Sequence, residues 1–229
     1  MSDTPLIECR ALCKSYEDVA VRVDVLKGLD LRIEAGDMTA VVGVSGVGKT
    51  TLLYILGLLE RPTGGDVLYE GQNVFDGKTD WELSRFRNEV IGFVFQFHNL
   101  IPEFTAVENA MMPAIIAGLG KREAREKAME ALSILGVADR AEHKPGEISG
   151  GEQQRVAVAR ALVMRPRVVL ADEPTGNLDV DTAARMHDEF IRLNEELGLT
   201  FIVVTHNEAL ARRMRQVVRL HGGTAGRAA

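Results

Sequence analysis

A glycine-rich run in the first quarter of the chain has the residue types that bind phosphate groups. It fits the pattern G-x-x-x-x-G-K-[ST], and it reads Gly43-Val44-Ser45-Gly46-Val47-Gly48-Lys49-Thr50, followed by Thr51. Glycines let the backbone curl so that successive N–H groups face phosphate oxygens, and a helix beginning near Lys49 would add its positive end. Lys49 can reach the β- and γ-phosphates, and the Thr50 hydroxyl can ligate Mg²⁺. A structural turn is the alternative, but an apolar strand before the run and a helix after it favour a nucleoside triphosphate site.

Two adjacent carboxylates follow an apolar run later in the chain. Asp172 and Glu173 come directly after Val168–Ala171, which has the composition of a buried parallel strand. Successive side chains of a strand point in opposite directions, so the two acids are expected to have different roles. Asp172 is the predicted Mg²⁺ ligand, and Glu173 is the predicted general base that polarises the attacking water. The alternative is a pair of acids that cap a helix.

The elements that position these residues follow from hydrophobic periodicity. Compact apolar runs predict parallel strands at 38–42, 91–95, 168–171 and 201–205, and alternating runs predict antiparallel strands at 6–13 and 24–33. Helices are expected at 49–59 and throughout 104–164, including 152–164. One domain over 1–229 is expected, with a core and β subdomain at 1–96 and 165–229 and a helical subdomain at 97–164. The Gly- and Ala-rich residues 222–229 are expected to fray.

Bulk composition narrows the functional classes. The 229 residues are 46% hydrophobic and 26% charged with a net charge of −6, which indicates a soluble globular protein and disfavours nucleic acid as the main partner. No apolar run approaches the ~20 residues of a membrane-spanning helix, and the polar residues 1–5 do not predict a signal peptide. The two cysteines, Cys9 and Cys13, are expected to be reduced thiols, because further zinc ligands at suitable spacing are lacking.

A third motif belongs to one family. The run Ile148-Ser149-Gly150-Gly151-Glu152-Gln153-Gln154-Arg155 resembles the signature motif of ABC transporter ATPases, with Ile148 where Leu is usual. It lies after the phosphate loop and before Asp172, as in the family, and the resemblance covers nearly the whole chain. It implies an α/β fold: a P-loop NTPase core of the ABC ATPase type, with an N-terminal antiparallel β subdomain and an inserted helical subdomain.

The resemblance extends to four further positions and implies their roles. Gln96 resembles the glutamine that contacts Mg²⁺ and the attacking water, and Gly176-Asn177-Leu178-Asp179 resembles the D-loop, which places Asp179 near the nucleotide. His206 resembles the switch histidine that contacts the γ-phosphate. Tyr16 lies where the family stacks an aromatic ring on adenine, although simple packing is an alternative for this residue. Val47 replaces a usually small polar residue, with little consequence expected because its backbone N–H binds the phosphate.

The resemblance also implies a second copy of the chain as partner. In the family, the signature of one subunit, here Ser149, Gly150 and Gly151, closes over the ATP bound to the phosphate loop of the other. An isologous dimer with two ATP molecules at its seam would result. A soluble ABC-type protein acting on ribosomes or DNA would usually carry two ATPase units or a coiled-coil insertion, which this chain does not have. A regulatory module without turnover is disfavoured by the intact Glu173 and His206.

The segment after Gln96 indicates the branch of the family. The run at 97–109, FHNLIPEFTAVEN, followed by Met111-Met112-Pro113, looks like the ATP-binding subunits of the Lol lipoprotein-releasing system. The ATPases of macrolide export and of cell division are the alternatives. The first reading implies integral membrane permease subunits of the lipoprotein-release type as partners. It also implies a peripheral location at the cytoplasmic face of the inner membrane, with membrane contact only through the permease.

Overall fold

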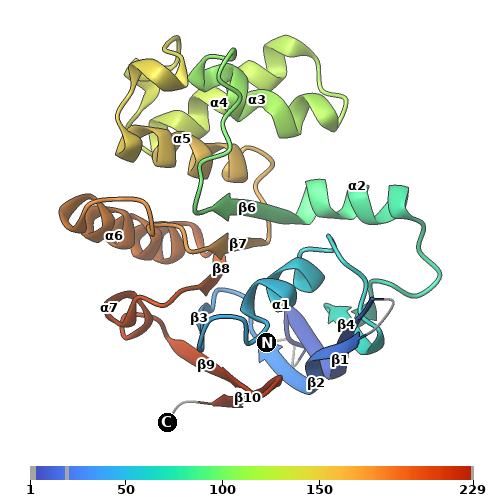
Figure 1. The fold of residues 1–229 in the computed structure, drawn as a ribbon. Helices are drawn as coiled ribbons and strands as arrows, with labels where there is room; N and C mark the ends of the chain where they lie inside the picture. Colours follow the sequence, from blue (N-terminus) through green and yellow to red (C-terminus); the bar gives the residue numbers. More distant parts are fainter. Residues whose placement is uncertain (1–3, 19–20, 228–229) are drawn as a thin grey trace. The chain divides into compact units, whose positions relative to one another are not determined.

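The computed structural model describes residues 4–18 and 21–227, and its internal contacts divide the chain into two units. The first unit comprises Met1–Ser84 and Thr200–Ala229, and the second comprises Arg85–Leu199. Figure 1 shows the helices and strands of both. Each unit holds its own share of the residues predicted to do chemistry.

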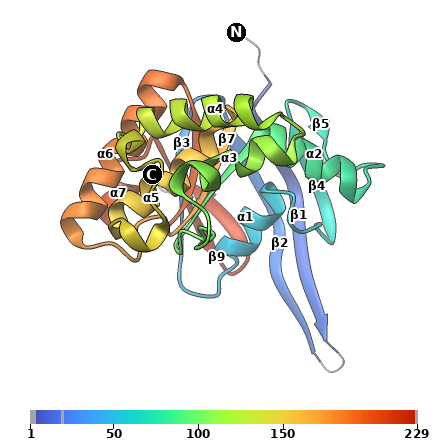
Figure 2. The same cartoon turned by 90° about the horizontal axis from the view of Figure 1, so that it is seen from above.

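An antiparallel sheet in the first unit has the strand order β2-β1-β4-β5, as Figure 2 shows for its long pair β1 and β2. The strands are β1 (Ile7–Asp18), β2 (Val21–Ile33), β4 (Gly64–Tyr69) and β5 (Gln72–Asn73). Ile7 pairs with Ile33, and both side chains are fully buried. The pair extends beyond the predicted 6–13 and 24–33 because polar partners continue it: the Ser15 hydroxyl donates to Asp24 Oδ1 at 2.7 Å.

The phosphate loop follows the central strand of a second sheet in this unit. β3 (Met38–Val42) lies parallel between β8 (Thr200–Val204) and β9 (Gln216–His221), and α1 (Lys49–Leu56) and α7 (Glu208–Ala211) belong to the same unit. Helix α1 is shorter than the predicted 49–59, because it ends at Gly57 and Leu58 takes a left-handed φ of 55°.

The expectation of a frayed C-terminus is wrong for most of its length. β10 (Thr224–Arg227) pairs antiparallel with β9, and Thr224 lies opposite His221. Gly222 and Gly223 form the connecting turn with φ of 58° and 89°, the conformation that a tight two-residue hairpin requires. The glycines that suggested disorder therefore make a turn, while Ala228 and Ala229 lie outside the described residues.

The second unit combines a parallel strand pair with helices. β6 (Ile91–Phe95) pairs with β7 (Val168–Asp172), so that Phe95 lies opposite Asp172. The second unit contains the end of α2 (Asp80–Val90) and four whole helices: α3 (Ala106–Ile116), α4 (Lys121–Ile134), α5 (Gly150–Leu162) and α6 (Val180–Leu197). Short 3₁₀ turns lie at Ala138–Arg140 and Pro145–Glu147. α5 packs against β6 so closely that a Cβ at Gly92 would lie 2.6 Å from the Ala161 carbonyl oxygen.

The α/β class with an antiparallel sheet and a helical part is confirmed by these elements. Both cysteines are free, and burial raises the pKa of the Cys9 thiol to about 12. Across residues 4–18 and 21–227, none of the helices has the length and apolar character that crossing a membrane would take.

Candidate functional site

The phosphate loop of the first unit connects β3 to α1, and its shape depends on glycine. Gly46 and Gly48 have φ of 76° and 106°, which side-chain-bearing residues rarely adopt. A Cβ at Gly43 would lie 2.7 Å from the Leu220 carbonyl oxygen, and a Cβ at Gly48 would lie 2.8 Å from Val25 Cγ1. The sequence positions that the phosphate-binding pattern requires to be glycine are therefore the positions where the surrounding structure leaves no room for a side chain.

Lys49 occupies the first turn of α1 and turns its ammonium group back over the loop. Its Nζ donates hydrogen bonds to the carbonyl oxygens of Gly43 at 2.8 Å and Val44 at 3.1 Å. Gly48 precedes the helix and offers no capping side chain, so the first N–H groups of α1 add their partial positive charge to that of Lys49. This concentration of donors suits a polyphosphate.

His206 lies close to the same loop within the first unit. A hollow of about 420 Å³ is lined by Gly43 and Val44 from the loop and by Thr205 and His206, which directly follow β8. The two motifs, more than 150 positions apart in the sequence, are neighbours because β8 pairs directly with β3. The structure therefore brings together two of the predicted site elements.

Tyr16 lies on β1 beside the first turn of α1. Its hydroxyl oxygen is 3.4 Å from Thr51 Oγ1, and its side chain is 40% exposed. The ring is thus tied to the residue that follows Thr50 and still presents open surface. This arrangement agrees with a base-stacking role, which remains a prediction.

The predicted metal ligand and base lie at the end of β7 in the second unit. Asp172 is the last residue of the strand, and Glu173 has a left-handed φ of 45°. Such a conformation costs free energy, and it persists only where the surroundings fix it. Here the amide nitrogen of Gly176 donates to the Glu173 carbonyl oxygen at 3.0 Å, which closes a turn. The turn fixes the backbone of Glu173 directly after the strand that ends at Asp172.

Gln96 is linked to the D-loop by a pair of hydrogen bonds. Its Nε2 donates to Asn177 Oδ1 at 3.1 Å, and Asn177 Nδ2 donates to the Gln96 carbonyl oxygen at 3.1 Å. Gly176 lies so near that a Cβ on it would be 2.9 Å from Gln96 Nε2. The side-chain nitrogen is thereby used within the protein, and the side-chain oxygen is the atom that suits a cation.

The signature residues form the start of α5. Ser149 is the N-cap, and it shares a capping box with Glu152. The Ser149 hydroxyl accepts from the Glu152 N–H at 3.3 Å, and the Ser149 N–H and hydroxyl both donate to Glu152 Oε2, at 2.8 Å and 2.7 Å. These bonds and the Arg140 guanidinium lower the pKa of Glu152 to about 2. The box makes α5 begin at Gly150, two residues before the predicted start.

Asp179 has a structural role in addition to its predicted place near the nucleotide. Its carboxylate caps α6 by accepting the Thr182 N–H at 2.9 Å, and this bond lowers its pKa. The start of α6 also lies close to the start of α5, because a Cβ at Gly151 would be 2.7 Å from Thr182 Cγ2. The signature and the D-loop are therefore packed together within the second unit.

Sequence reasoning did not single out Gln154 as a positioning residue. Its side chain is fully buried on α5, and its Nε2 donates to the Pro174 carbonyl oxygen at 2.6 Å, one residue after Glu173. The next residue, Thr175, also has a buried partner, because its Oγ1 lies 3.0 Å from His187 Nε2. A glutamine on the apolar face of a helix was the available signal, since a buried amide needs a partner.

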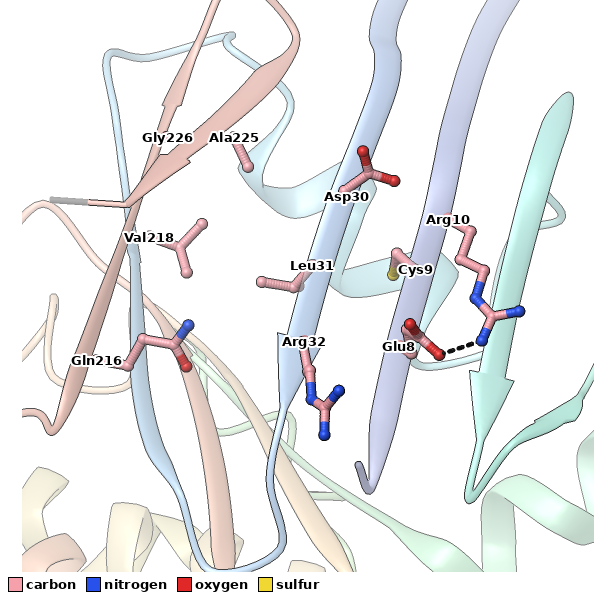
Figure 3. A pocket seen from close by; sticks show the side chains of 10 residues that line it. All are labelled: Glu8, Cys9, Arg10, Asp30, Leu31, Arg32, Gln216, Val218, Ala225 and Gly226. Atoms are coloured by element: carbon pink, nitrogen blue, oxygen red, sulfur yellow. Dashed lines mark hydrogen bonds and ion pairs between the residues drawn. The ribbon is translucent and has the colours of Figure 1, made fainter. Parts of the chain in front are cut away.

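A different hollow of the first unit, shown in Figure 3, carries no part of the predicted site. Its charged side chains have partners of their own. Glu8 pairs with Arg10 at 2.7 Å, Arg32 pairs with Glu34 at 2.6 Å, and Asp30 accepts the Ala11 N–H at 2.8 Å. These charges are paired with groups of the same sheet region, so they do not indicate a ligand site. The residues predicted to bind ATP and to catalyse its hydrolysis lie instead at the phosphate loop and at the end of β7.

Comparison with known proteins adds an independent line of evidence. Residues 26–176 match the family model described as "ABC transporter". The "Lipoprotein-releasing system ATP-binding protein LolD" of Syntrophus aciditrophicus is 54% identical over 218 residues, which cover 95% of this chain and 97% of the relative. The protein of the same name from Geobacter metallireducens is 53% identical over 218 residues, which cover 95% and 96%.

Solved structures agree with this result. The dimeric structure of MJ0796, described as a bacterial ABC transporter cassette, has a TM-score of 0.87 and 40% identity, and the match covers 96% of this chain and 97% of the other. The same cassette in a dimeric post-hydrolysis state bound to ADP and Pi has a TM-score of 0.86 and 39% identity over the same shares.

Proposed function

Because the chain belongs to the ABC transporter family, as an ATP-binding protein of the LolD type, we propose that it powers a lipoprotein-releasing system. ATP hydrolysis by this subunit would drive the release of lipoproteins from the inner membrane toward the outer membrane. The observation that carries the proposal is the identity of about half of all residues with relatives of that name, over nearly the full length of both chains.

Hydrolysis is assigned to four side chains. Lys49 and the N–H groups of the loop bind the β- and γ-phosphates and stabilise the charge that develops on them. Glu173 accepts a proton from the attacking water, and Gln96 orients that water. His206 contacts the γ-phosphate; its place beside Gly43 and Val44 supports this role.

The available donors fit a magnesium ion. A hydroxyl from Thr50, an amide oxygen from Gln96 and a carboxylate from Asp172 are the hard oxygen ligands that Mg²⁺ prefers. We propose that these three residues hold it. When bound, the ion neutralises charge on the phosphate oxygens.

A second copy of the chain completes the nucleotide site in this proposal. Ser149, Gly150 and Gly151 of one copy would close over the ATP held by Gly43–Thr51 of the other, with Asp179 at the seam. The dimeric form of the MJ0796 cassette supports such an arrangement. Permease subunits of the lipoprotein-release type would attach the pair to the cytoplasmic face of the inner membrane as a peripheral protein.

Reconstitution tests the proposal directly. The chain is co-purified with a lipoprotein-release permease pair, and the complex is reconstituted in proteoliposomes that contain a labelled lipoprotein. Transfer of the labelled lipoprotein to a soluble carrier is then measured after ATP is added. Release is expected with the wild type and lost with Lys49→Ala. If a macrolide-exporter or cell-division membrane protein binds the chain and the lipoprotein permease does not, the branch assignment is wrong, while the ATPase assignment stands.

A further inference from the structure

A small hydrogen-bonded network surrounds the ring of Tyr16 in the first unit. The Tyr16 hydroxyl donates to Glu60 Oε2 at 2.6 Å, a distance typical of a strong bond to a carboxylate. The same hydroxyl lies 3.4 Å from Thr51 Oγ1. Glu60 follows α1, whereas Thr51 lies in its first turn, so the hydroxyl is fixed between the two ends of the phosphate-binding helix.

Lys14 adds a second restraint from β1. Its Nζ lies 4.9 Å from the centroid of the Tyr16 ring, on one face of it. It also donates to the Arg61 carbonyl oxygen at 2.9 Å and lies 3.5 Å from Glu60 Oε2. One oxygen of Glu60 therefore holds both the hydroxyl of the ring and the cation that covers one of its faces.

The network leaves the ring usable as a stacking surface. Tyr16 is 40% exposed although its hydroxyl is engaged. Its pKa is raised, first by burial of the hydroxyl and then by Glu60, so the hydroxyl keeps the proton that it donates. A tyrosine that only filled the core would not combine an anchored hydroxyl with an open ring.

We propose that Glu60 is a positioning residue for nucleotide binding: it holds the Tyr16 ring so that a purine base stacks on the face opposite Lys14. The inference rests on the proposed function, in which the phosphate loop holds ATP and Tyr16 meets its base. Glu60 acts through Tyr16 and contributes to the share of affinity that comes from the base. The phosphates are bound by the loop without its help.

The size of the effect follows from the cost of ordering a side chain. An unrestrained ring must be immobilised when the base binds, at a cost of about 0.5–1.5 kcal/mol, which corresponds to about 2- to 12-fold in Kd. We therefore expect Glu60→Ala to weaken ATP binding by about 3- to 10-fold. Glu60→Gln keeps an oxygen acceptor for the Tyr16 hydroxyl and should bind ATP within about twofold of the wild type.

Calorimetric titration of the full chain with Mg-ATP and with Mg-tripolyphosphate, which has no base, separates the affinity that comes from the base from the affinity that comes from the phosphates. Glu60→Ala and Tyr16→Phe should weaken ATP to a similar degree and leave tripolyphosphate unchanged, and the double variant should be no weaker than either single one. Glu34→Ala is the matched control, since it also removes one surface carboxylate from an ion pair and should change neither ligand.

The possible results distinguish a failure of the Glu60 role from a failure of the proposed ATP-binding function. If Tyr16→Ala weakens ATP but Glu60→Ala does not, stacking stands and the role of Glu60 is refuted. Equal weakening of ATP and tripolyphosphate by Glu60→Ala would also overturn it, because that pattern reports a general loss of fold or charge. If the wild type binds neither ligand, the phosphate-loop assignment itself fails.

Discussion

Replacing Glu173 with Gln is the most direct test of the assigned chemistry. Gln has nearly the same size and can adopt the same left-handed φ of 45° as readily as Glu. Bonds from the Gly176 N–H, from Gln154 and within the Thr175–His187 pair support the turn without using the Glu173 carboxylate, so they survive the substitution. The free energy of unfolding should therefore change by less than about 0.5 kcal/mol.

The rate should change far more than the stability. A positioned general base contributes about 10²–10⁴-fold, so single-turnover hydrolysis by Glu173→Gln should fall by that factor, equivalent to about 3–5 kcal/mol of barrier. ATP should still bind, because removing a negative charge near the γ-phosphate does not weaken Lys49 or the loop. The closed dimer should then accumulate, since bound ATP favours it and is not consumed.

The assay combines rapid-quench hydrolysis of labelled ATP with size-exclusion chromatography in Mg-ATP. Asp172→Asn is the comparison: it should lose hydrolysis through weaker metal binding and should not trap a dimer. Hydrolysis near the wild-type rate in Glu173→Gln would refute its role as base and leave His206 or substrate-held water. A slow variant that stays monomeric would keep the chemistry and refute the closing role of the signature in the isolated chain.

Three further predictions follow from single contacts. Lys49→Ala removes the cation held over the loop at 2.8 Å from the Gly43 carbonyl oxygen and should weaken Mg-ATP by about 10- to 100-fold in calorimetry, and an unchanged Kd would contradict the assignment. Gln154→Leu deprives the Pro174 carbonyl oxygen of its 2.6 Å donor and should lower the free energy of unfolding by about 1–3 kcal/mol in denaturant titration. It should also lower kcat while KM for ATP stays constant, and a parallel rise in KM would argue against a positioning role. The Glu152 pKa of about 2 lies below the ordinary 4.5, so its ionised carboxylate stabilises the fold fully above pH 4.5, and this stabilisation is lost as pH falls toward 2. It amounts to at most about 3 kcal/mol, reduced by solvent screening, and an unchanged pH dependence of unfolding in Glu152→Gln would contradict it.

Local chemistry explains what the sequence could predict. The phosphate loop and the strand before Asp172 were predictable because their residue types directly dictate backbone shape, as the φ of 106° at Gly48 illustrates. The polar end of the β1–β2 pair was not, because hydrogen bonds such as Ser15 to Asp24 leave no hydrophobic periodicity. The same limit hid Glu60, whose partner Tyr16 is 44 positions away. Side-chain networks of that kind emerge only from the fold.

The two helix starts assigned to the nucleotide differ in charge, and this difference implies an order of events. α1 begins after Gly48 with Lys49 in its first turn and no acidic residue there, so its positive end is undiminished. α5 begins with a capping box whose Glu152 stays ionised, and this carboxylate offsets part of the helix dipole. ATP should therefore bind the phosphate loop first, and the signature of the second copy should close weakly enough to reopen once hydrolysis removes the γ-phosphate.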